Sequence, residues 1–288
     1  DGDNLVGPSV GDNSVAVAAL VELPSILPSS LGRPVWLVAT VGEEGHGNLR
    51  GVSSLLGRWG EQVGSVIALE GNYLGRVNRL GIGSERIRVT VVGPGGHSWE
   101  EAHHPSAVEE ACRMICLTRQ HFDSLLPGFQ GRVTLNVGRI EGGASVNARA
   151  TDCAFLVEVR AEEPEDLASA TGALRALFTT RIQGLQVGLE VLGSRPAGSI
   201  SPHHPLVTAS LDALRETGIE PRLTSASTDA NAAYALGIPA VTLGIAIGGG
   251  THTTGEWIDP STVAMGLKAL ALTVETVARQ EADSWNPV

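Results

Sequence analysis

The pattern of apolar residues changes twice along the chain, and this change constrains the fold more than any other feature. Before residue 77 and after residue 194, the predicted strands are short, continuous apolar runs bounded by Pro or Gly, such as PVWLVATV at 34–41. Such runs are typical of strands buried on both faces of a parallel sheet. Between the two changes the strands alternate, as in ERIRVTVV at 85–92, which is typical of a sheet with one wet face. We therefore expect one domain inserted into another.

The order of the predicted elements assigns a class to each domain. The outer segments, 1–76 and 195–288, predict an α/β domain with a mostly parallel sheet flanked by helices. The middle segment, 77–194, has the order β-α-β-β-α-β of an inserted ferredoxin-like α+β domain. A chain of 288 residues is long enough for two cores. The predicted elements are a helix at 12–23, a strand at 34–41, a helix at 47–59, strands at 65–70 and 85–92, a helix at 105–126, strands at 132–140 and 153–161, a helix at 163–180, a strand at 186–192, helices at 204–218 and 229–237, a strand at 239–245 and a helix at 260–280.

The charge of the chain limits the partners that it is expected to bind. Lys and Arg number 20 against 31 Asp and Glu, a net charge of −11, which argues against nucleic acid and against an anionic membrane surface. No stretch approaches the roughly 18 consecutive apolar residues of a membrane-spanning helix. The polar first residues do not read as a signal peptide. We therefore expect small molecules as partners.

The cysteines indicate a compartment. Cys112, Cys116 and Cys153 are too few for a disulfide framework in a chain of this length, so a reducing cytoplasm is expected. Cys112 and Cys116 lie four residues apart on a predicted helix, and no further Cys or His nearby completes a metal site with them. Because free cysteine is commonly buried, we expect both in the core.

Two adjacent carboxylates, Glu43 and Glu44, lie in the loop directly after the predicted strand at 34–41. Ligands bind at the carboxyl ends of strands in open α/β sheets, so this loop is in the place of a functional site. One of two adjacent acids can bind a metal ion while the other takes a proton from water. A Glu-Glu pair beside Gly is also common in a solvated turn, and this alternative stays open for the pair alone.

Three further residues occupy comparable places. Glu70 ends the predicted strand at 65–70, Asp12 lies at a glycine-flanked turn before the first helix, and His252 lies in the turn GGGTHTTGEW after the strand at 239–245. Carboxylates with an imidazole are ligands of zinc and similar divalent ions. Each residue also has a plain alternative, since Asp12 could cap the helix, Glu70 could be a surface acid and His252 a loop histidine.

Several motifs, taken in order, resemble a known family. They are DGDNLVGPSVGDN, VGEEGHGNLRG, IALEG, GPGGHS, SVNARA, VEVRA, STDAN, GIPAVTLG and THTTGEW, between residue 1 and about residue 280. The family is that of the di-zinc metallopeptidases, which includes glutamate carboxypeptidases, aminoacylases, succinyl-diaminopimelate desuccinylase and peptidase T. The resemblance implies a catalytic domain that binds two divalent ions, Zn²⁺ or alternatively Co²⁺ or Mn²⁺. It also implies that the insertion, 77–194, is a dimerisation domain.

The resemblance also implies a role for each residue of the outer segments. Asp12 would bridge the two ions, Glu44 and His252 would complete one metal site, and Glu70 would serve the other. Glu43 would be the general base, which takes a proton from the attacking water and passes it to the leaving nitrogen. The implied activity is hydrolysis of the amide bond of a peptide or N-acyl amino acid by a cytoplasmic homodimer.

Three residues of the insertion match family positions as well. His97, in GPGGHSW, matches a histidine that reaches the active site of the partner subunit and steadies the oxyanion; its alternative is a structural loop histidine. Asn147 and Arg160 match positions that contact the substrate's carboxylate or the carbonyl to be cleaved. Arginine suits bidentate recognition of a carboxylate.

One departure from the family leaves alternatives open. The family's first ligand is the histidine of a His-x-Asp motif upstream of the bridging Asp, and this sequence starts only eleven residues before Asp12. Either the sequence is truncated at its N-terminus, or the protein has one impaired metal site. We favour truncation, because a parallel sheet without its opening strands would expose apolar edges. The alternative functions are a catalytically impaired dimeric binding protein and an aminopeptidase. Arg160 argues against the aminopeptidase, because it would repel an ammonium group.

Overall fold

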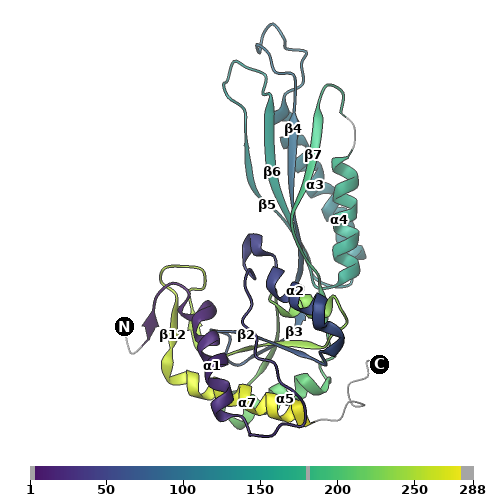
Figure 1. The fold of residues 1–288 in the computed structure, drawn as a ribbon. Helices are drawn as coiled ribbons and strands as arrows, with labels where there is room; N and C mark the ends of the chain where they lie inside the picture. Colours follow the sequence, from purple (N-terminus) through teal and green to yellow (C-terminus); the bar gives the residue numbers. More distant parts are fainter. Residues whose placement is uncertain (1–3, 180–181, 280–288) are drawn as a thin grey trace. The chain divides into compact units, whose positions relative to one another are not determined.

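The computed structural model describes residues 4–179 and 182–279, which divide into two compact units (Figure 1). Unit 1 consists of the chain up to Gly81 and from Ser199 onward, and unit 2 runs from Ile82 to Gly198. The first boundary lies later than predicted, because strand β3 (Arg76–Gly81) pairs within the sheet of unit 1. Asp1 and Gly2 of the first motif, and the predicted helix ends at Thr180 and Gln280, lie outside the described residues.

Unit 1 is built on a five-stranded sheet with the order β2-β10-β3-β8, in which β9 also pairs with β3 and β8 is the short strand Gly198–Ser199. Strand β2 (Val66–Glu70) is parallel to β10 (Ala240–Gly244), and β3 is parallel to β9 (Arg222–Ala226). Strand β3 runs antiparallel to β10. Every residue of β10 is buried, as its continuous apolar sequence predicts. The predicted α/β class with a mostly parallel sheet is confirmed.

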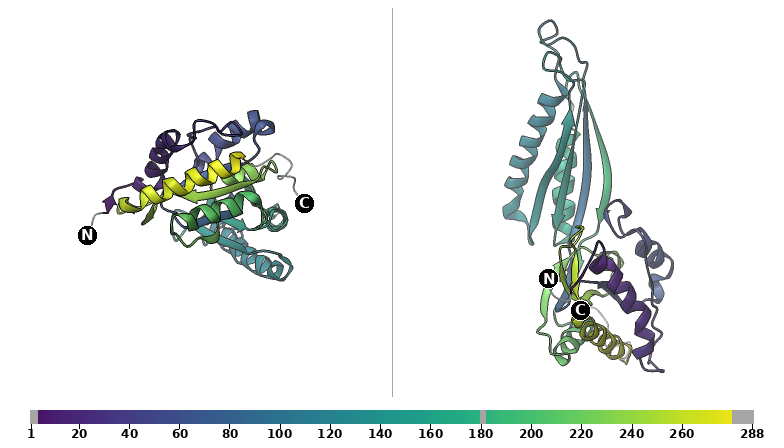
Figure 2. Two further views of the ribbon diagram at one scale, coloured as in Figure 1. Left: turned by 90° about the horizontal axis from the view of Figure 1, so that it is seen from below. Right: turned by 90° about the vertical axis from the view of Figure 1, so that its left-hand side faces the viewer.

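Helices cover both faces of this sheet (Figures 1 and 2). Helices α1 (Ala16–Ile26), α5 (Pro205–Glu216) and α7 (Val263–Arg279) share one core with Val241 and Leu243 of β10. Helices α2 (Arg50–Trp59) and α6 (Ala230–Tyr234) share the other core, with Ala240. The segment Pro260–Arg279 is long and apolar enough to cross a membrane by length and composition alone. Its residues Leu270 and Val274 are buried in the core of unit 1.

The predicted strand at 34–41 is not formed. Among the described residues no strand pairs with this run, and Trp36, Leu37, Val38 and Val41 are exposed. An apolar run becomes a strand only where its backbone N–H and C=O groups find partners. The prediction was therefore wrong about pairing and burial, although the loop with Glu43 and Glu44 does follow the run.

Unit 2 is a four-stranded antiparallel sheet with the order β5-β6-β4-β7, covered on one face by two helices (Figure 1). The elements follow the predicted β-α-β-β-α-β order, with the first and third strands in the centre, as in a ferredoxin-like fold. Phe155 and Phe178 pack edge to face in its core, with ring centroids 5.7 Å apart. The elements are β4 (Gly83–Val92), α3 (Ala107–Leu125), β5 (Val133–Gly142), β6 (Asp152–Ala161), α4 (Pro164–Phe178) and β7 (Gln186–Arg195).

The expected burial of two cysteines is wrong. Cys112 and Cys116 are exposed, whereas Cys153 is buried. Helix α3 buries Ala107, Ala111, Met114, Thr118 and Phe122, which recur at helical spacing. This stripe leaves Cys112 and Cys116 on the parts of the helix surface that face water.

Candidate metal centre

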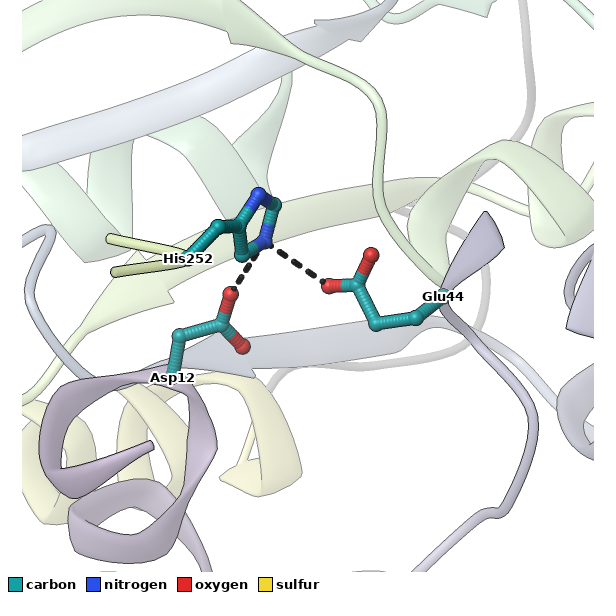
Figure 3. Close-up of side chains that lie close together, drawn as sticks. All are labelled: Asp12, Glu44 and His252. Carbon is teal, nitrogen blue, oxygen red and sulfur yellow. Dashed lines mark hydrogen bonds and ion pairs between the residues drawn. The ribbon is translucent and has the colours of Figure 1, made fainter. Parts of the chain in front are cut away.

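Asp12, Glu44 and His252 converge in unit 1 (Figure 3). Nε2 of His252 lies 2.9 Å from Oδ2 of Asp12 and 3.2 Å from Oε1 of Glu44. One ligand atom from each residue lies within 4.8 Å of the other two. Two carboxylates and an imidazole are a donor set suited to zinc and to related divalent ions. The structure therefore gathers three residues that are far apart in the sequence into a group that fits a divalent cation.

The backbone around each of the three residues is irregular. Asp12 lies in a wide turn, Val10–Val15, and departs from helical geometry with φ −106° and ψ 91°. Glu44 precedes a short 3-10 turn at Gly45–Gly47. His252 has φ 65°, in the left-handed region that side chains other than glycine rarely occupy. The left-handed conformation of His252 is of a kind that persists where the surroundings demand it and that concentrates at functional sites.

The alternative that Asp12 is only a helix cap does not describe the structure. Helix α1 begins at Ala16, and no side chain caps it or the wide turn before it. The Asp12 side chain instead contacts His252 from the opposite end of the chain. Its exposed fraction is 14%, against 63% for Glu44 and 65% for His252.

The charges of the group perturb one another. Burial raises the pKa of Asp12, and the negative charge of Glu44 raises it further. Burial alone would lower the pKa of His252, but the carboxylates of Glu44 and Asp12 outweigh it and raise that pKa. A bound cation would shift the protonation of Asp12 and His252, because a divalent ion favours an ionised carboxylate and a neutral imidazole.

Glu70 lies close to this group without joining it. Burial raises its pKa to about 8, and the negative charges of Asp12, Glu43, Glu44 and Asp229 contribute. The group of ligand atoms found among the described residues does not include Glu70. Because several carboxylates crowd together here, Glu70 keeps its proton near neutral pH. A cation bound among these carboxylates could replace that proton.

The raised pKa of Glu70 predicts how the metal-free protein depends on pH. A carboxyl group with a higher pKa in the folded state stabilises the fold below pH 4.5, and this contribution is lost as the pH rises to 8 and above. In Glu70→Gln the amide stands in for the protonated acid. We expect both metal-free proteins to melt alike at pH 4 and the variant to melt at the higher temperature at pH 9. Thermal melts in a chelating buffer across this range measure the difference, and a difference independent of pH would contradict the assignment.

In unit 2, the structure places His97 beside Asn147. His97 forms an isolated antiparallel bridge with Ala148, and the N–H of Ser98 donates to the carbonyl of Asn147 at 3.0 Å. The N–H of Trp99 donates to Nδ1 of the His97 ring at 3.3 Å. His97 and Asn147, the two residues predicted to contact the substrate from these loops, therefore lie on neighbouring segments. Their roles stay predictions.

Arg160 lies apart from this loop pair. It is near the end of β6, whereas Asn147 precedes the start of that strand, and β6 spans about 26 Å from Asp152 to Arg160. Nε of Arg160 donates to Glu158 at 2.8 Å, and Glu158 also accepts from Arg86. The structure does not bring Arg160 together with Asn147, and its guanidinium is engaged by a neighbouring carboxylate.

Two polar residues near the site were assigned no role from the sequence. Oγ1 of Thr40 donates to Oδ2 of Asp229 at 2.6 Å, which ties the segment before Glu43 to the start of α6. Nδ2 of Asn72 donates to Oγ1 of Thr251, next to His252, at 2.8 Å. The sequence motif STDAN contains Asp229 and so could have drawn attention to it. The sequence gives no sign of the long-range partners of Asp229 and Asn72.

Known proteins with the same fold are found by comparison. Residues 1–276 match the Peptidase family M20/M25/M40. The crystal structure of aminopeptidase PepT from Bacillus cereus is similar, with 21% identity and a TM-score of 0.73 over 93% of this chain and 71% of that chain. A tripeptidase from Staphylococcus aureus has 20% identity and a TM-score of 0.72 over the same shares, 93% and 71%.

A more distant similarity extends to amidases. An amidase of the hydantoinase/carbamoylase family from Burkholderia phymatum has 17% identity and a TM-score of 0.55, over 74% of this chain and 54% of that chain. No curated protein matches the chain significantly. At these identities the likeness to solved structures concerns the fold.

Proposed function

Because the chain belongs to the peptidase family M20/M25/M40, whose members are peptidases and amidohydrolases, we propose that it hydrolyses an amide bond of a peptide or N-acyl amino acid with the help of divalent metal ions. The observation that carries this proposal is the convergence of Asp12, Glu44 and His252. The motif resemblance of the sequence implies metal ligands at these residues, and their donor atoms lie close together. Zn²⁺ is the proposed ion, with Co²⁺ and Mn²⁺ as alternatives.

The proposed roles follow from the positions of the carboxylates. Asp12, Glu44 and His252 would hold one ion, and Asp12 would share a second ion with Glu70. When bound, the ions supply Lewis acidity that polarises the amide carbonyl and lowers the pKa of water. Asp12 is suited to bridging because it is the least exposed of the three converging ligands.

Glu43 is proposed as the general base. It lies next to Glu44 in the chain, and its negative charge is among those that raise the pKa of Glu70. Its carboxylate would take a proton from the attacking water and donate it to the leaving nitrogen, so that the nitrogen departs as a neutral amine. For both transfers the Glu43 carboxylate must come within hydrogen-bond reach of the attacking water and of the leaving nitrogen.

The substrate class is proposed as short peptides, with N-acyl amino acids as the alternative. The engaged state of Arg160, which pairs with Glu158, weakens the sequence argument against substrates with a free amine. Two similar structures are those of an aminopeptidase and a tripeptidase, so tripeptides belong among the first substrates to test. We further propose that the enzyme is cytoplasmic and forms a homodimer through unit 2, whose His97 and Asn147 would contact the substrate.

The test is zinc stoichiometry together with hydrolysis of a substrate panel. Purified protein is loaded with ZnCl2, freed of loosely bound ions, and analysed for zinc per chain. Initial rates are then measured with unblocked di- and tripeptides, N-blocked peptides and N-acetyl amino acids. We expect tightly held zinc and cleavage within the panel; preference for unblocked tripeptides would identify an aminopeptidase. Tightly held zinc without cleavage would favour the catalytically impaired binding protein, and no bound zinc would refute the metal site.

A further inference from the structure

We propose that Glu256 is a positioning residue that holds Asp12 and His252 in the mutual arrangement needed to bind metal, an inference that rests on the proposed metal site. Glu256 is among the most buried charged residues of the described chain, with an exposed fraction of 1%. A buried carboxylate is costly unless hydrogen bonds satisfy it. The partners that satisfy Glu256 therefore show what this residue does.

Those partners are backbone N–H groups of the turn that contains Asp12. Oε1 of Glu256 accepts from the N–H of Gly11 at 2.9 Å and from that of Asp12 at 2.5 Å. Oε2 accepts from the N–H of Ser9 at 3.2 Å, and the backbone carbonyl of Glu256 accepts from the N–H of Gly7 at 2.8 Å. In the described part of the chain, Glu256 forms no ion pair with Lys or Arg. The side chain of Glu256 thus accepts hydrogen bonds from three backbone N–H groups of this turn and holds the turn in place.

Glu256 also belongs to the loop that carries His252. This loop joins β11 (Ile247–Gly249) to β12 (Trp257–Asp259), and the N–H of Glu256 donates to the carbonyl of Thr253 at 3.3 Å. A single side chain therefore links the backbone of one proposed ligand to the loop of another. Movement of this loop relative to the turn would separate Asp12 from His252.

The carboxylate of Glu256 lies so close to Gly11 that a larger residue at this position would displace it. A Cβ at Gly11 would lie 2.7 Å from Oε1 of Glu256 and 3.1 Å from Nδ2 of Asn72. Asn72, which follows the β2 strand that ends in Glu70, is itself bonded to Thr251. The end of β2, the turn with Asp12 and the loop with His252 thus meet at Gly11. The side chain of Glu256 accepts three of the hydrogen bonds across this junction.

The Glu256→Gln variant tests the proposal because it keeps the size of the side chain. The amide nitrogen replaces one carboxylate oxygen, and its hydrogens would face an N–H donor of the turn. We expect zinc to bind about 10- to 100-fold more weakly, the range seen when a group that orients a metal ligand is removed. The dissociation constant is measured by titrating ZnCl2 into the metal-free full-length chain in competition with a chromophoric chelator. Thermal melts of the same samples record stability separately.

Asp166→Asn is the matched control. Asp166 is a buried carboxylate of unit 2, 5% exposed, whose Oδ2 accepts from the N–H groups of Gln130 at 2.9 Å and Gly131 at 2.8 Å. The change likewise replaces a buried, backbone-bonded carboxylate with a neutral amide, in a unit that lacks the proposed metal ligands. We expect a lower melting temperature and an unchanged affinity for zinc. Equal weakening of zinc binding in both variants would overturn the proposal, because it would mean a general effect of instability.

A Glu256→Gln variant that binds zinc with the affinity of the wild type would also overturn the proposal. If that variant does not fold, Glu256→Asp, which keeps the charge but draws the carboxylate back from the turn, is measured in the same way and held to the same outcomes. Wild-type protein that binds no zinc would refute the proposed metal site itself. Wild-type binding with unaffected variants would refute only the role of Glu256.

Discussion

Replacing Glu43 with Gln is expected to lower kcat about 10²- to 10⁴-fold, the usual contribution of a general base, while zinc stays bound. The amide of Gln cannot take a proton from water, whereas the proposed ligands Asp12, Glu44 and His252 are left intact. Turnover and zinc content are measured on the same preparation, with the best substrate of the panel. The loss of rate without loss of metal is the signature that separates a base from a ligand.

Glu61→Gln is the control for this change. Glu61 is an exposed carboxylate of unit 1, in the short 3-10 turn Gly60–Gln62, and its substitution removes the same charge without touching the site. We expect kcat within about threefold of the wild type, because surface substitutions away from special features have small effects. If E43Q kept the rate of this control, Glu43 would not be the base.

Replacing Asp12 with Asn is expected to abolish turnover by removing the metal. Asp12 is the proposed ligand of both ions, so the loss of zinc affinity should exceed the roughly 10- to 100-fold loss that follows removal of an orienting group. The melting temperature of the metal-free protein should not fall, since burial and the charge of Glu44 raise the pKa of Asp12 and oppose its ionisation. Zinc affinity is thus expected to fall without a fall in the stability of the metal-free protein.

The comparison is Asp259→Asn, in the same unit. The Asp259 carboxylate accepts from the N–H of Ser261 at 2.9 Å and caps the short turn before α7. Because Asn caps a helix about as well as Asp, this change should alter stability little and leave zinc binding unchanged. D12N that still bound zinc with wild-type affinity would remove Asp12 from the metal site.

Much of the fold could be predicted from the periodicity of the sequence. The alternation at 85–92 is matched by burial of Ile87, Val89 and Val91 in β4, and the continuous run at 239–245 becomes the fully buried β10. These predictions succeeded because the periodicity of a strand reflects which of its faces are buried. The family resemblance drawn from ordered motifs is confirmed by the match over residues 1–276.

The strand predicted at 34–41 shows where periodicity stops being informative. Its residues are as apolar as those of β10, yet Trp36 and Val41 are exposed. Composition records how well a segment would pack, but pairing depends on a second segment elsewhere in the chain. Among the described residues, no strand fills that place beside 34–41.

The sequence by itself determined the two fold classes, their order, and a set of candidate ligands that includes Asp12, Glu44 and His252. Only the tertiary structure decided that these three side chains meet, that Arg160 is engaged by Glu158, and that Glu256 is buried against the turn of Asp12. The reason is physical: periodicity and motifs report the local surroundings of a residue, whereas a carboxylate's partner 244 positions away is chosen by how the whole unit packs.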